Sequence, residues 1–324
     1  MDKTPLVSVI VATRNRKDML NRLLLGLHSQ LQPPSFEVIV ADNSASHTAA
    51  DILERPAQGF TLRGLHVPEP GKGRALNAAL RQACGQLLVL TDDDVRPHPR
   101  WLTELHRAAQ EHPEAAVFGG RIEVLNPVPR WIRESENLMG LLTTGHERSM
   151  EVYGYGQYPF GPNMAIRKRL ILGIERPYPE DMGPGTALPV GDESAFLMPL
   201  SAPNARDRRY VHAASVVHDV LASRLKLSVA LRRARAQGRS QARLGIPIVL
   251  PGEGPKQMSF AAQVQRRIRA CRSLSEFACV VARQLGHVQE CALHSSGTLI
   301  PHVPALGREL PSKGGVPRKP VVRS

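Results

Sequence analysis

Short apolar runs alternate with segments of helical periodicity over the first 125 residues. The run at 7–12 is largely β-branched and does not alternate, which predicts a strand covered on both faces. Leucines then recur at helical spacing from Leu20 to Leu31, so an amphipathic helix is expected before Pro33. Further strands are expected at 36–41, 62–67, 87–91, 115–118 and 122–125, and further helices at 75–84 and 99–110. This order predicts an α/β fold with a mainly parallel central sheet flanked by helices.

The rest of the chain is organised differently. Residues 126–189 are rich in Gly, Pro and Tyr, which predicts long loops and short strands over the working edge of the sheet. Beyond Asp219 the pattern is helical and basic, with helices expected at 221–243 and at 259–293. The last thirty residues have the Pro- and Gly-rich composition of a disordered tail. We therefore expect a domain over 1–220 with halves 1–125 and 126–220, a basic helical extension over 221–294, and a tail over 295–324.

Charge is distributed unevenly along the chain. The net charge is +13, and residues 206–324 hold 21 Lys and Arg against 6 Asp and Glu. Such a basic segment suits an anionic partner, either a membrane surface or a nucleic acid. Aromatic side chains that could stack on bases are scarce there, being only Tyr210, Phe260 and Phe277. The helix expected at 221–243 combines apolar and cationic residues that suit an anionic bilayer surface, although an ordinary solvated helix would have the same composition.

Cysteine usage and hydropathy point to a cytoplasmic protein. The 4 cysteines include no C-x-x-C pair, so neither a disulfide framework nor a structural zinc site is indicated. The apolar run at 6–12 is too short for a signal peptide, and no stretch approaches the roughly 18 apolar residues of a membrane span. We expect a cytoplasmic chain, soluble or peripheral on the inner face of the membrane.

Polar and acidic residues follow three of the expected strands. These are Thr13 and Arg14, Asp42, and the triple Asp92-Asp93-Asp94. Ligands of open α/β sheets bind beyond the carboxyl ends of the strands, although Asp42 alone could equally form a turn. Adjacent carboxylates are costly unless a cation compensates them, and oxygen ligands select Mg²⁺ or Mn²⁺. Asp92 and Asp94, two residues apart, can face one ion, and such an ion commonly completes its coordination with substrate phosphates.

Two loop segments add candidate chemistry. The loop at 70–74 reads Pro-Gly-Lys-Gly-Arg and could approach a phosphate, but it lacks the spacing of a P-loop or of a dinucleotide fingerprint. Asp192 and Glu193 precede an apolar helix start. They could complement the helix N-terminus, or one of them could deprotonate a hydroxyl.

The combination of these segments resembles glycosyltransferase family 2, with its GT-A fold, over roughly residues 5–240. The matching pieces are 7–16, 38–44, Gly73 to Asn77, Thr91 to Asp94, 161–163 and 191–193, in this order and spacing. The resemblance implies an inverting transfer of sugar from a nucleoside-diphosphate sugar to an acceptor hydroxyl on a glycan, a lipid-linked saccharide or a small molecule. It also implies a divalent metal, Mn²⁺ or Mg²⁺, a nucleotide-binding half at 1–125 and an acceptor-binding half at 126–220.

Site roles follow from the same resemblance, position by position. Asp92 and Asp94 would form the D-x-D element around the metal, and His218 is similar to a histidine that some members place on the metal or on the leaving diphosphate. A partly buried structural histidine remains the alternative for His218. Glu193 aligns with the catalytic base, with Asp192 kept as a candidate because the family order is usually Glu-Asp. The donor would contact Thr13, Arg14, Asp42, Gly73, Arg74, Asp92 and Asp93, and Asn163 would lie on the acceptor side.

Two other classes of function were weighed against this one. A sugar-nucleotide nucleotidyltransferase shares a parallel sheet and metal carboxylates, but a glycine-rich basic loop is expected near its first strand, and 12–16 contains no glycine. A non-enzymatic nucleic-acid-binding protein would account for the basic segment, but aromatic side chains suited to base stacking are scarce there. The sequence therefore favours a metal-dependent transferase without a nucleic-acid partner.

Overall fold

The computed structural model describes residues 4–55, 59–145, 147–149, 151–153, 157–200, 207–245 and 260–295. The tail expected at 295–324 lies outside these residues, apart from its first residue. The strands are β1 (Val7–Thr13), β2 (Phe36–Asp42), β3 (Thr61–His66), β4 (Leu87–Asp92), β5 (Val95–Pro97), β6 (Val117–Val124), β7 (Met164–Arg167) and β8 (Arg208–His218). The helices are α1 (Lys17–His28), α2 (Ala50–Leu53), α3 (Lys72–Gln82), α4 (Trp101–Glu111), α5 (Arg130–Arg133), α6 (Glu136–Thr143), α7 (Asp192–Leu197), α8 (Leu227–Arg243), α9 (Phe260–Arg269) and α10 (Leu274–Ser295).

One sheet of eight strands organises these elements, in the order β3-β2-β1-β4-β7-β6-β8-β5. The first four strands in this order run parallel, as expected from the βαβ pattern. Beyond β4 the sheet is mixed, because β7 runs antiparallel to both β4 and β6, and β5 runs antiparallel to β8. The predicted α/β fold is confirmed, and the parallel part is the half that carries the acidic triple.

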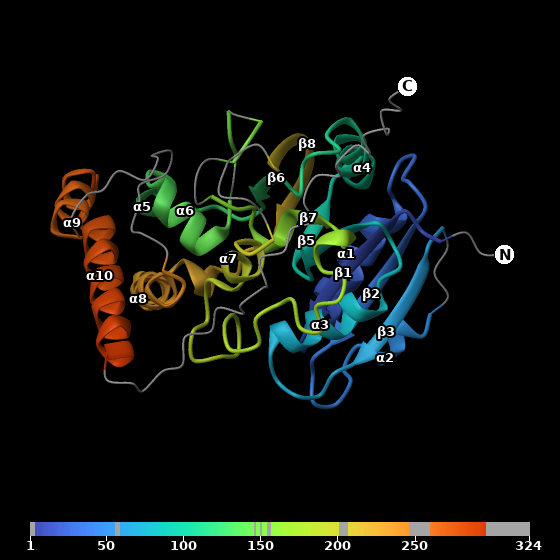
Figure 1. Ribbon diagram of the computed structural model, residues 1–324, viewed down its shortest axis with the longest axis horizontal. Helices are drawn as coiled ribbons and strands as arrows, with labels where there is room; N and C mark the ends of the chain where they lie inside the picture. Colours follow the sequence, from blue (N-terminus) through green and yellow to red (C-terminus); the bar gives the residue numbers. More distant parts are fainter. Residues whose placement is uncertain are drawn as a thin grey trace, which may run out of the picture.

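Each face of the sheet has its own hydrophobic core (Figure 1). On one face α1, α2 and α4 cover β1, β2 and β4 through leucines of α1 and the fully buried Trp101. On the other face α3 and α7 cover the same strands through Ala75, Leu76 and Phe196. Burial on both faces explains the continuous apolar runs of these strands.

A third cluster joins the C-terminal helices to the domain. Leu138, Leu141 and Leu142 of α6 pack with Ala230 and Ala234 of α8, and Cys279 of α10 closes the cluster. In Figure 1, α8 lies between α10 and the rest of the molecule. One side of α8 is therefore covered by α6 and α10, while Arg232 and Arg235 are exposed. Contact of this helix with a bilayer stays a prediction. Within the described residues, no helix is both long and apolar enough to cross a membrane.

Several elements differ from the sequence prediction. The segment expected to be loops and short strands contains the short strand β7 but also the helices α5 and α6. The strands expected at 115–118 and 122–125 form the single strand β6. The second basic helical stretch is divided into α9 and α10, and the helix expected from 221 begins at Leu227 after a 3-10 turn over Ala222–Leu225.

Candidate functional site

The end of β1 is tied to the acidic triple through Asp93. Thr13 Oγ1 donates to Asp93 Oδ2 at 2.7 Å, and Arg16 Nη1 lies 3.1 Å from Asp93 Oδ1 and 2.9 Å from Asp94 Oδ2. Burial raises the pKa of Asp93 to about 6 against the opposing charge of Arg16. Thr13 and Asp93 therefore hold strand ends together, while Arg14 is exposed at the edge.

Asp94 faces a buried histidine at the end of β8. His218 is 1% exposed, its Nδ1 lies 2.7 Å from the carbonyl oxygen of Thr143, and its Nε2 lies 3.3 Å from Asp94 Oδ1. A carbonyl only accepts, so Nδ1 carries the proton and Nε2 of the neutral ring presents a lone pair. Asp94 Oδ1 is itself buried without a hydrogen-bond partner. Burial raises the pKa of Asp94, but the hydrogen bond and charge that the protonated form of His218 supplies, together with the charge of Arg16, outweigh it and bring that pKa to about 2.

The facing lone pairs of Asp94 and neutral His218 fit a cation. Either a second proton on the imidazole or a metal ion between the two groups would satisfy both atoms. No set of three or more His, Cys, Asp or Glu side chains in the described part of the chain could hold a metal by itself. A divalent ion at Asp94 and His218 would therefore need further ligands from water or from a bound substrate.

Asp92 is turned toward a lysine rather than toward Asp94. Lys72 Nζ lies 2.6 Å from Asp92 Oδ1. This ion pair joins the first turn of α3 to the end of β4. Burial lowers the pKa of the Lys72 ammonium, but the charges of Asp92, Asp192 and Glu193 outweigh it, so this pKa is raised. A permanently charged lysine thus stands beside the carboxylate that was expected on the metal.

Two buried residues at the end of β2, Asp42 and Asn43, hold the loops around Lys72. Asn43 Nδ2 donates to the carbonyl oxygens of Val67 and Glu69, and its Oδ1 accepts from the Gly71 amide at 2.9 Å. Both carboxylate oxygens of Asp42 accept backbone amides of the turn that follows it, each at 2.9 Å. Asp42 is 0% exposed, so its observed role is the turn that the sequence left as an alternative.

The start of α3 lies against the loop that precedes the Asp192-Glu193 motif. A Cβ added to Gly73 would stand 1.9 Å from the carbonyl oxygen of Pro179, so only glycine allows this approach. Asn77 donates to the Tyr178 carbonyl at 2.9 Å and accepts from its amide at 2.9 Å. Arg74 is half-exposed and lies 3.6 Å from a carboxylate oxygen of Glu180.

Asp192 and Glu193 have different environments. Asp192 is 2% exposed, and Tyr178 Oη donates to its Oδ2 at 3.1 Å. Burial, followed by the charge of Glu193, raises the pKa of Asp192 to about 8. Glu193 is half-buried. Its Oε1 lies so close to Gly161 that a Cβ added to this glycine would stand 2.7 Å from it. Asp192 therefore keeps its proton to a higher pH than an ordinary aspartate does.

Asn163 is buried and hydrogen-bonded within the protein. Its side chain is 0% exposed, its Oδ1 accepts from Trp101 Nε1 at 2.9 Å, and its Nδ2 donates to the carbonyl oxygens of Arg121 and Ala214. All its polar groups are engaged in joining α4, β6 and β8. These bonds give Asn163 a structural role, and its place on the acceptor side stays a prediction.

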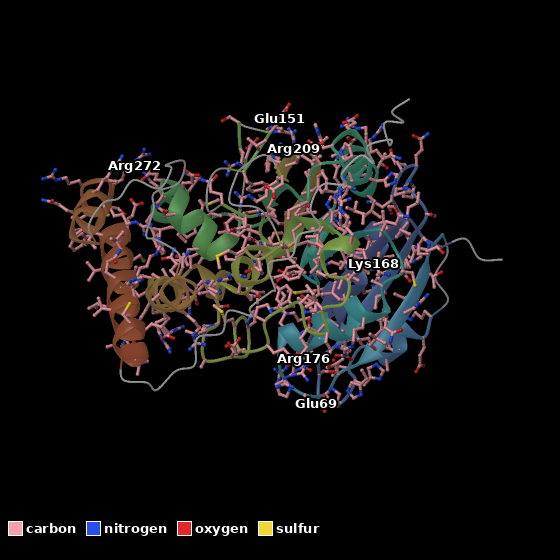
Figure 2. All side chains as sticks on the ribbon, in the orientation of Figure 1. Glu69, Glu151, Lys168, Arg176, Arg209 and Arg272 are labelled. Atoms are coloured by element: carbon pink, nitrogen blue, oxygen red, sulfur yellow. The ribbon has the colours of Figure 1, made fainter. Side chains whose placement is uncertain are left out.

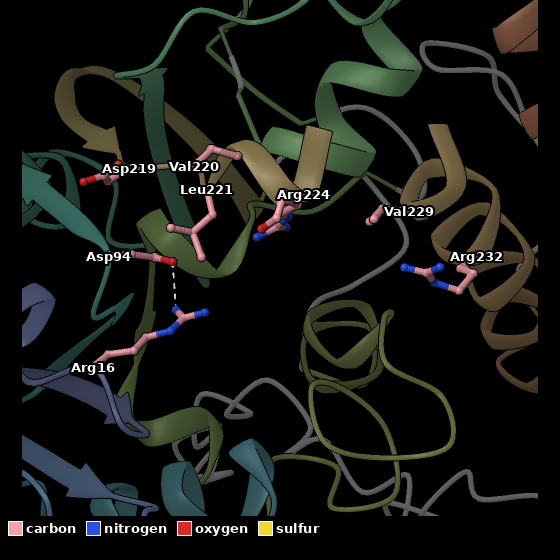
Figure 3. Close-up of a pocket in the computed structure, with 9 residues that line it drawn as sticks. Arg16, Asp94, Asp219, Val220, Leu221, Arg224, Val229 and Arg232 are labelled. Carbon is pink, nitrogen blue, oxygen red and sulfur yellow. Dashed lines mark hydrogen bonds and ion pairs between the residues drawn. The ribbon is translucent and has the colours of Figure 1, made fainter. Parts of the chain in front are cut away.

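A pocket of about 330 Å³ opens beside Asp94 (Figure 3). The segment after β8 and the first turns of α8 form much of its wall. Arg224 borders the pocket, and its Nε is buried without a hydrogen-bond partner. The lining residues are Arg16, Asp94, Asp219, Val220, Leu221, Ser223, Arg224, Val229 and Arg232.

Helix α8 also supports the loop that leads to Asp192. Ser240 Oγ donates to the Val190 carbonyl at 2.7 Å, and Arg243 Nη1 lies 3.3 Å from Asp181 Oδ2. Glu290 of α10 is 0% exposed and lies 2.8 Å from Arg239 Nε and 2.8 Å from Arg243 Nη2. Two of the arginines that suggested a surface helix, Arg239 and Arg243, are thus bound by a carboxylate inside the molecule.

The sequence prediction missed several residues that shape this site. Tyr178 and Thr143 lie in the loop-rich region and carry no local pattern. Arg16 stands within a predicted motif, but its carboxylate partners are distant in sequence. Lys72 was expected to approach a phosphate, but its ion pair with Asp92 was not predicted. Asn43 follows Asp42 directly, so its position just after a predicted strand could have identified it as a site residue.

Comparison with known proteins gives a consistent family. Residues 8–172 match the family model described as "Glycosyl transferase family 2". Glycosyltransferase AglE of Haloferax volcanii is 29% identical over 126 residues, which are 38% of this chain and 41% of the relative. Dolichol-phosphate mannosyltransferase of Pyrococcus furiosus is 22% identical over 175 residues, which are 52% of this chain and 48% of the relative. The matches span less than half of the length of these curated relatives.

Solved structures share the fold. The mannosyltransferase PcManGT of Pyrobaculum calidifontis, in complex with GDP-Man and Mn²⁺, has a TM-score of 0.54 at 19% identity, covering 91% of this chain and 80% of that one. Staphylococcus aureus TarS residues 1–349, in complex with UDP, have a TM-score of 0.51 at 18% identity, covering 90% and 91%. These neighbours show a GT-A type fold for the whole described sheet. The family model spans half of the sequence and includes the acidic triple, so this chain belongs to glycosyl transferase family 2.

Proposed function

We propose that the chain is a metal-dependent, inverting glycosyltransferase that moves a sugar from a nucleoside-diphosphate sugar to an acceptor hydroxyl. The observation that carries this proposal is the pair of facing acceptor atoms on Asp94 and His218, at the strand ends where the resemblance to the family implies a D-x-D element. Family membership disfavours the nucleotidyltransferase and nucleic-acid alternatives. Neighbours of the same fold are described with UDP, UDP-GlcNAc, and GDP-Man with Mn²⁺.

Asp94, with His218 and Asp92, would hold the divalent ion, Mn²⁺ or Mg²⁺. Such an ion, when bound, neutralises charge on the departing nucleoside diphosphate. Asp92 is within reach of Lys72, so the ammonium and the ion would share that carboxylate. Lys72, Arg16 and Arg224 would supply the remaining positive charge for the diphosphate.

Glu193 is the proposed general base, and Asp192 supports it. A protonated Asp192 places a neutral group next to Glu193, the carboxyl that would accept the hydroxyl proton. Tyr178 and the backbone around Gly161 fix the positions of the two carboxyls. One base without an enzymic nucleophile leads to displacement from the opposite face of the sugar and so to inversion.

The test is nucleoside diphosphate release from a panel of sugar nucleotides that includes UDP-GlcNAc and GDP-mannose. Release with Mn²⁺ that stops on chelation supports the proposal. The anomeric configuration of the released sugar, followed by proton NMR at early times, reports the stereochemistry. Retention of configuration, or equal release in the presence of a chelator, would contradict the mechanism.

A further inference from the structure

Exposed charge on the outermost helices has one sign. In the described part of 260–295 the acidic residues are Glu276 and Glu290, and both are buried. Glu276 accepts from Ser135, and Glu290 is enclosed by the two arginines of α8. The exposed charged side chains described here are all arginines, namely Arg266, Arg269 and Arg272.

An apolar stripe runs along α10 on the side away from α8. Leu274, Phe277, Leu285 and Val288 are 87%, 41%, 61% and 54% exposed. With half-buried Val281 they recur at 3- or 4-residue steps, which places them on one side of the helix. Residues of the opposite side, such as Glu276, Cys279, Gly286 and Glu290, are buried. We call the four exposed residues, together with Arg269 and Arg272 at the α9–α10 junction, the α10 outer face.

We propose that the α10 outer face docks on an anionic phospholipid membrane. Exposed apolar side chains beside cations of one sign are the combination that binds an interface between water and anionic lipid. A second copy of this chain fits less well, because the face offers no exposed carboxylate to the arginines of a partner. Figure 2 shows Arg272 at the end of the molecule that lies opposite the β3 edge.

Docking through this face has a consequence for the candidate site. Helix α8 packs against α10 and contributes Val229 and Arg232 to the pocket beside Asp94. Two helices, α8 and then α10, therefore lie between the pocket and the proposed membrane surface. The proposal moves the membrane contact from α8, whose Arg239 and Arg243 are used inside the molecule, to the outer surface of α9 and α10.

Vesicle co-sedimentation of the full chain tests the proposal. Vesicles of phosphatidylcholine with about 30 mol% phosphatidylserine are compared with phosphatidylcholine alone, at low and at high salt. We expect binding only to the anionic vesicles, with loss at high salt. The double variant Arg269→Glu/Arg272→Glu should bind at least roughly 25-fold more weakly, taking about fivefold for each arginine removed. Leu285→Ser should also reduce binding.

Matched controls lie on other surfaces. Leu172 is 65% exposed and Arg81 is exposed at the end of α3, so Leu172→Ser and Arg81→Glu should bind as the wild type does. Circular dichroism of each variant checks that the helices are retained. The assay needs no sugar nucleotide, so its result is independent of the proposed enzymatic activity.

Three outcomes overturn the proposal. These are absence of wild-type binding to anionic vesicles, equal binding to neutral vesicles, and unchanged binding in the Leu285 and arginine variants. A fourth outcome, measured by light scattering, would also overturn it. A wild-type dimer that Leu285→Ser dissociates, without any effect on vesicle binding, would assign the α10 outer face to self-association instead.

Discussion

Nε2 of His218, at the end of β8, lies 3.3 Å from Oδ1 of Asp94, just after β4. The Thr143 carbonyl fixes the proton on the other ring nitrogen, so the two facing atoms are both acceptors when the ring is neutral. The sheet order separates β4 from β8 by two strands, and the short strand β5 brings them together through its pairing with β8. This relationship underlies the metal proposal.

Replacement of His218 should weaken metal binding without unfolding the chain. We expect His218→Ala to reduce Mn²⁺ affinity by about 10- to 100-fold, because one ligand or its orienting partner is removed. Free Mn²⁺ measured by electron paramagnetic resonance gives the affinity. His98→Ala, at an exposed histidine, is the matched control and should bind Mn²⁺ as the wild type does. Unchanged affinity in His218→Ala would assign His218 a structural role.

The two carboxyls before α7 should differ in kinetic effect. Glu193→Gln should lower transfer or hydrolysis by about 10²- to 10⁴-fold while nucleotide binding is retained, because it removes the proton acceptor. Asp192→Asn should have a much smaller effect, since Asn imitates the protonated carboxyl. Turnover and nucleotide affinity are measured on both variants. If Asp192→Asn alone abolishes turnover, Asp192 is the general base instead of Glu193.

Asp192 should also make stability depend on pH. Its pKa in the folded chain is about 8, above the ordinary value, so the folded state keeps a proton that the unfolded state releases. The free energy of unfolding should therefore fall as pH rises from about 4 to 8 through this residue. In Asp192→Asn this contribution disappears, and the variant should gain stability relative to the wild type toward pH 8. Chemical denaturation at several pH values measures the difference, and parallel pH profiles would contradict it.

Glu290 should be essential for the packing of α8 on α10. Glu290→Gln leaves Arg239 and Arg243 without their buried counter-charge, so we expect a loss of about 3–5 kcal/mol in the free energy of unfolding. Gln289→Ala, which removes a bond to Arg235 at the exposed side, should cost less than about 1 kcal/mol. Urea denaturation followed by circular dichroism compares them. Equal stability of both variants would show that the buried ion pairs contribute little.

Local patterns predicted the parallel half of the fold. Leucine spacing defined α1, and unbroken apolar runs defined β1, β2 and β4, because burial on both faces of a sheet leaves a clear signature. The antiparallel strand β7 and helix α6 lie among glycines and prolines whose local pattern is weak. Arg239 and Arg243 of α8 were assigned to the surface because their partner Glu290 lies 51 and 47 residues away in sequence. The composition of a helix does not indicate which side chains from other segments will pack against it.

The candidate site was predicted at the level of motifs rather than contacts. The acidic triple, Lys72 and the Asp192-Glu193 motif all come together around one edge of the fold. The structural roles of Asn163, Asp42 and Thr13 depend on which buried groups need hydrogen bonds, and that requirement appears only once the strands are paired.

The most direct test is thermal unfolding with nucleoside diphosphates and sugar nucleotides, in Mn²⁺ or in a chelator, for the wild type and Asp94→Asn. A ligand at about 100 times its dissociation constant adds about 2.7 kcal/mol to the free energy of unfolding. We predict that at least one nucleotide raises the Tm of the wild type only when Mn²⁺ is present, and that Asp94→Asn loses this shift while keeping its ligand-free Tm within a few degrees. An equal shift in the chelator or in Asp94→Asn, or no shift with any of the nucleotides, would contradict metal-dependent donor binding at this site.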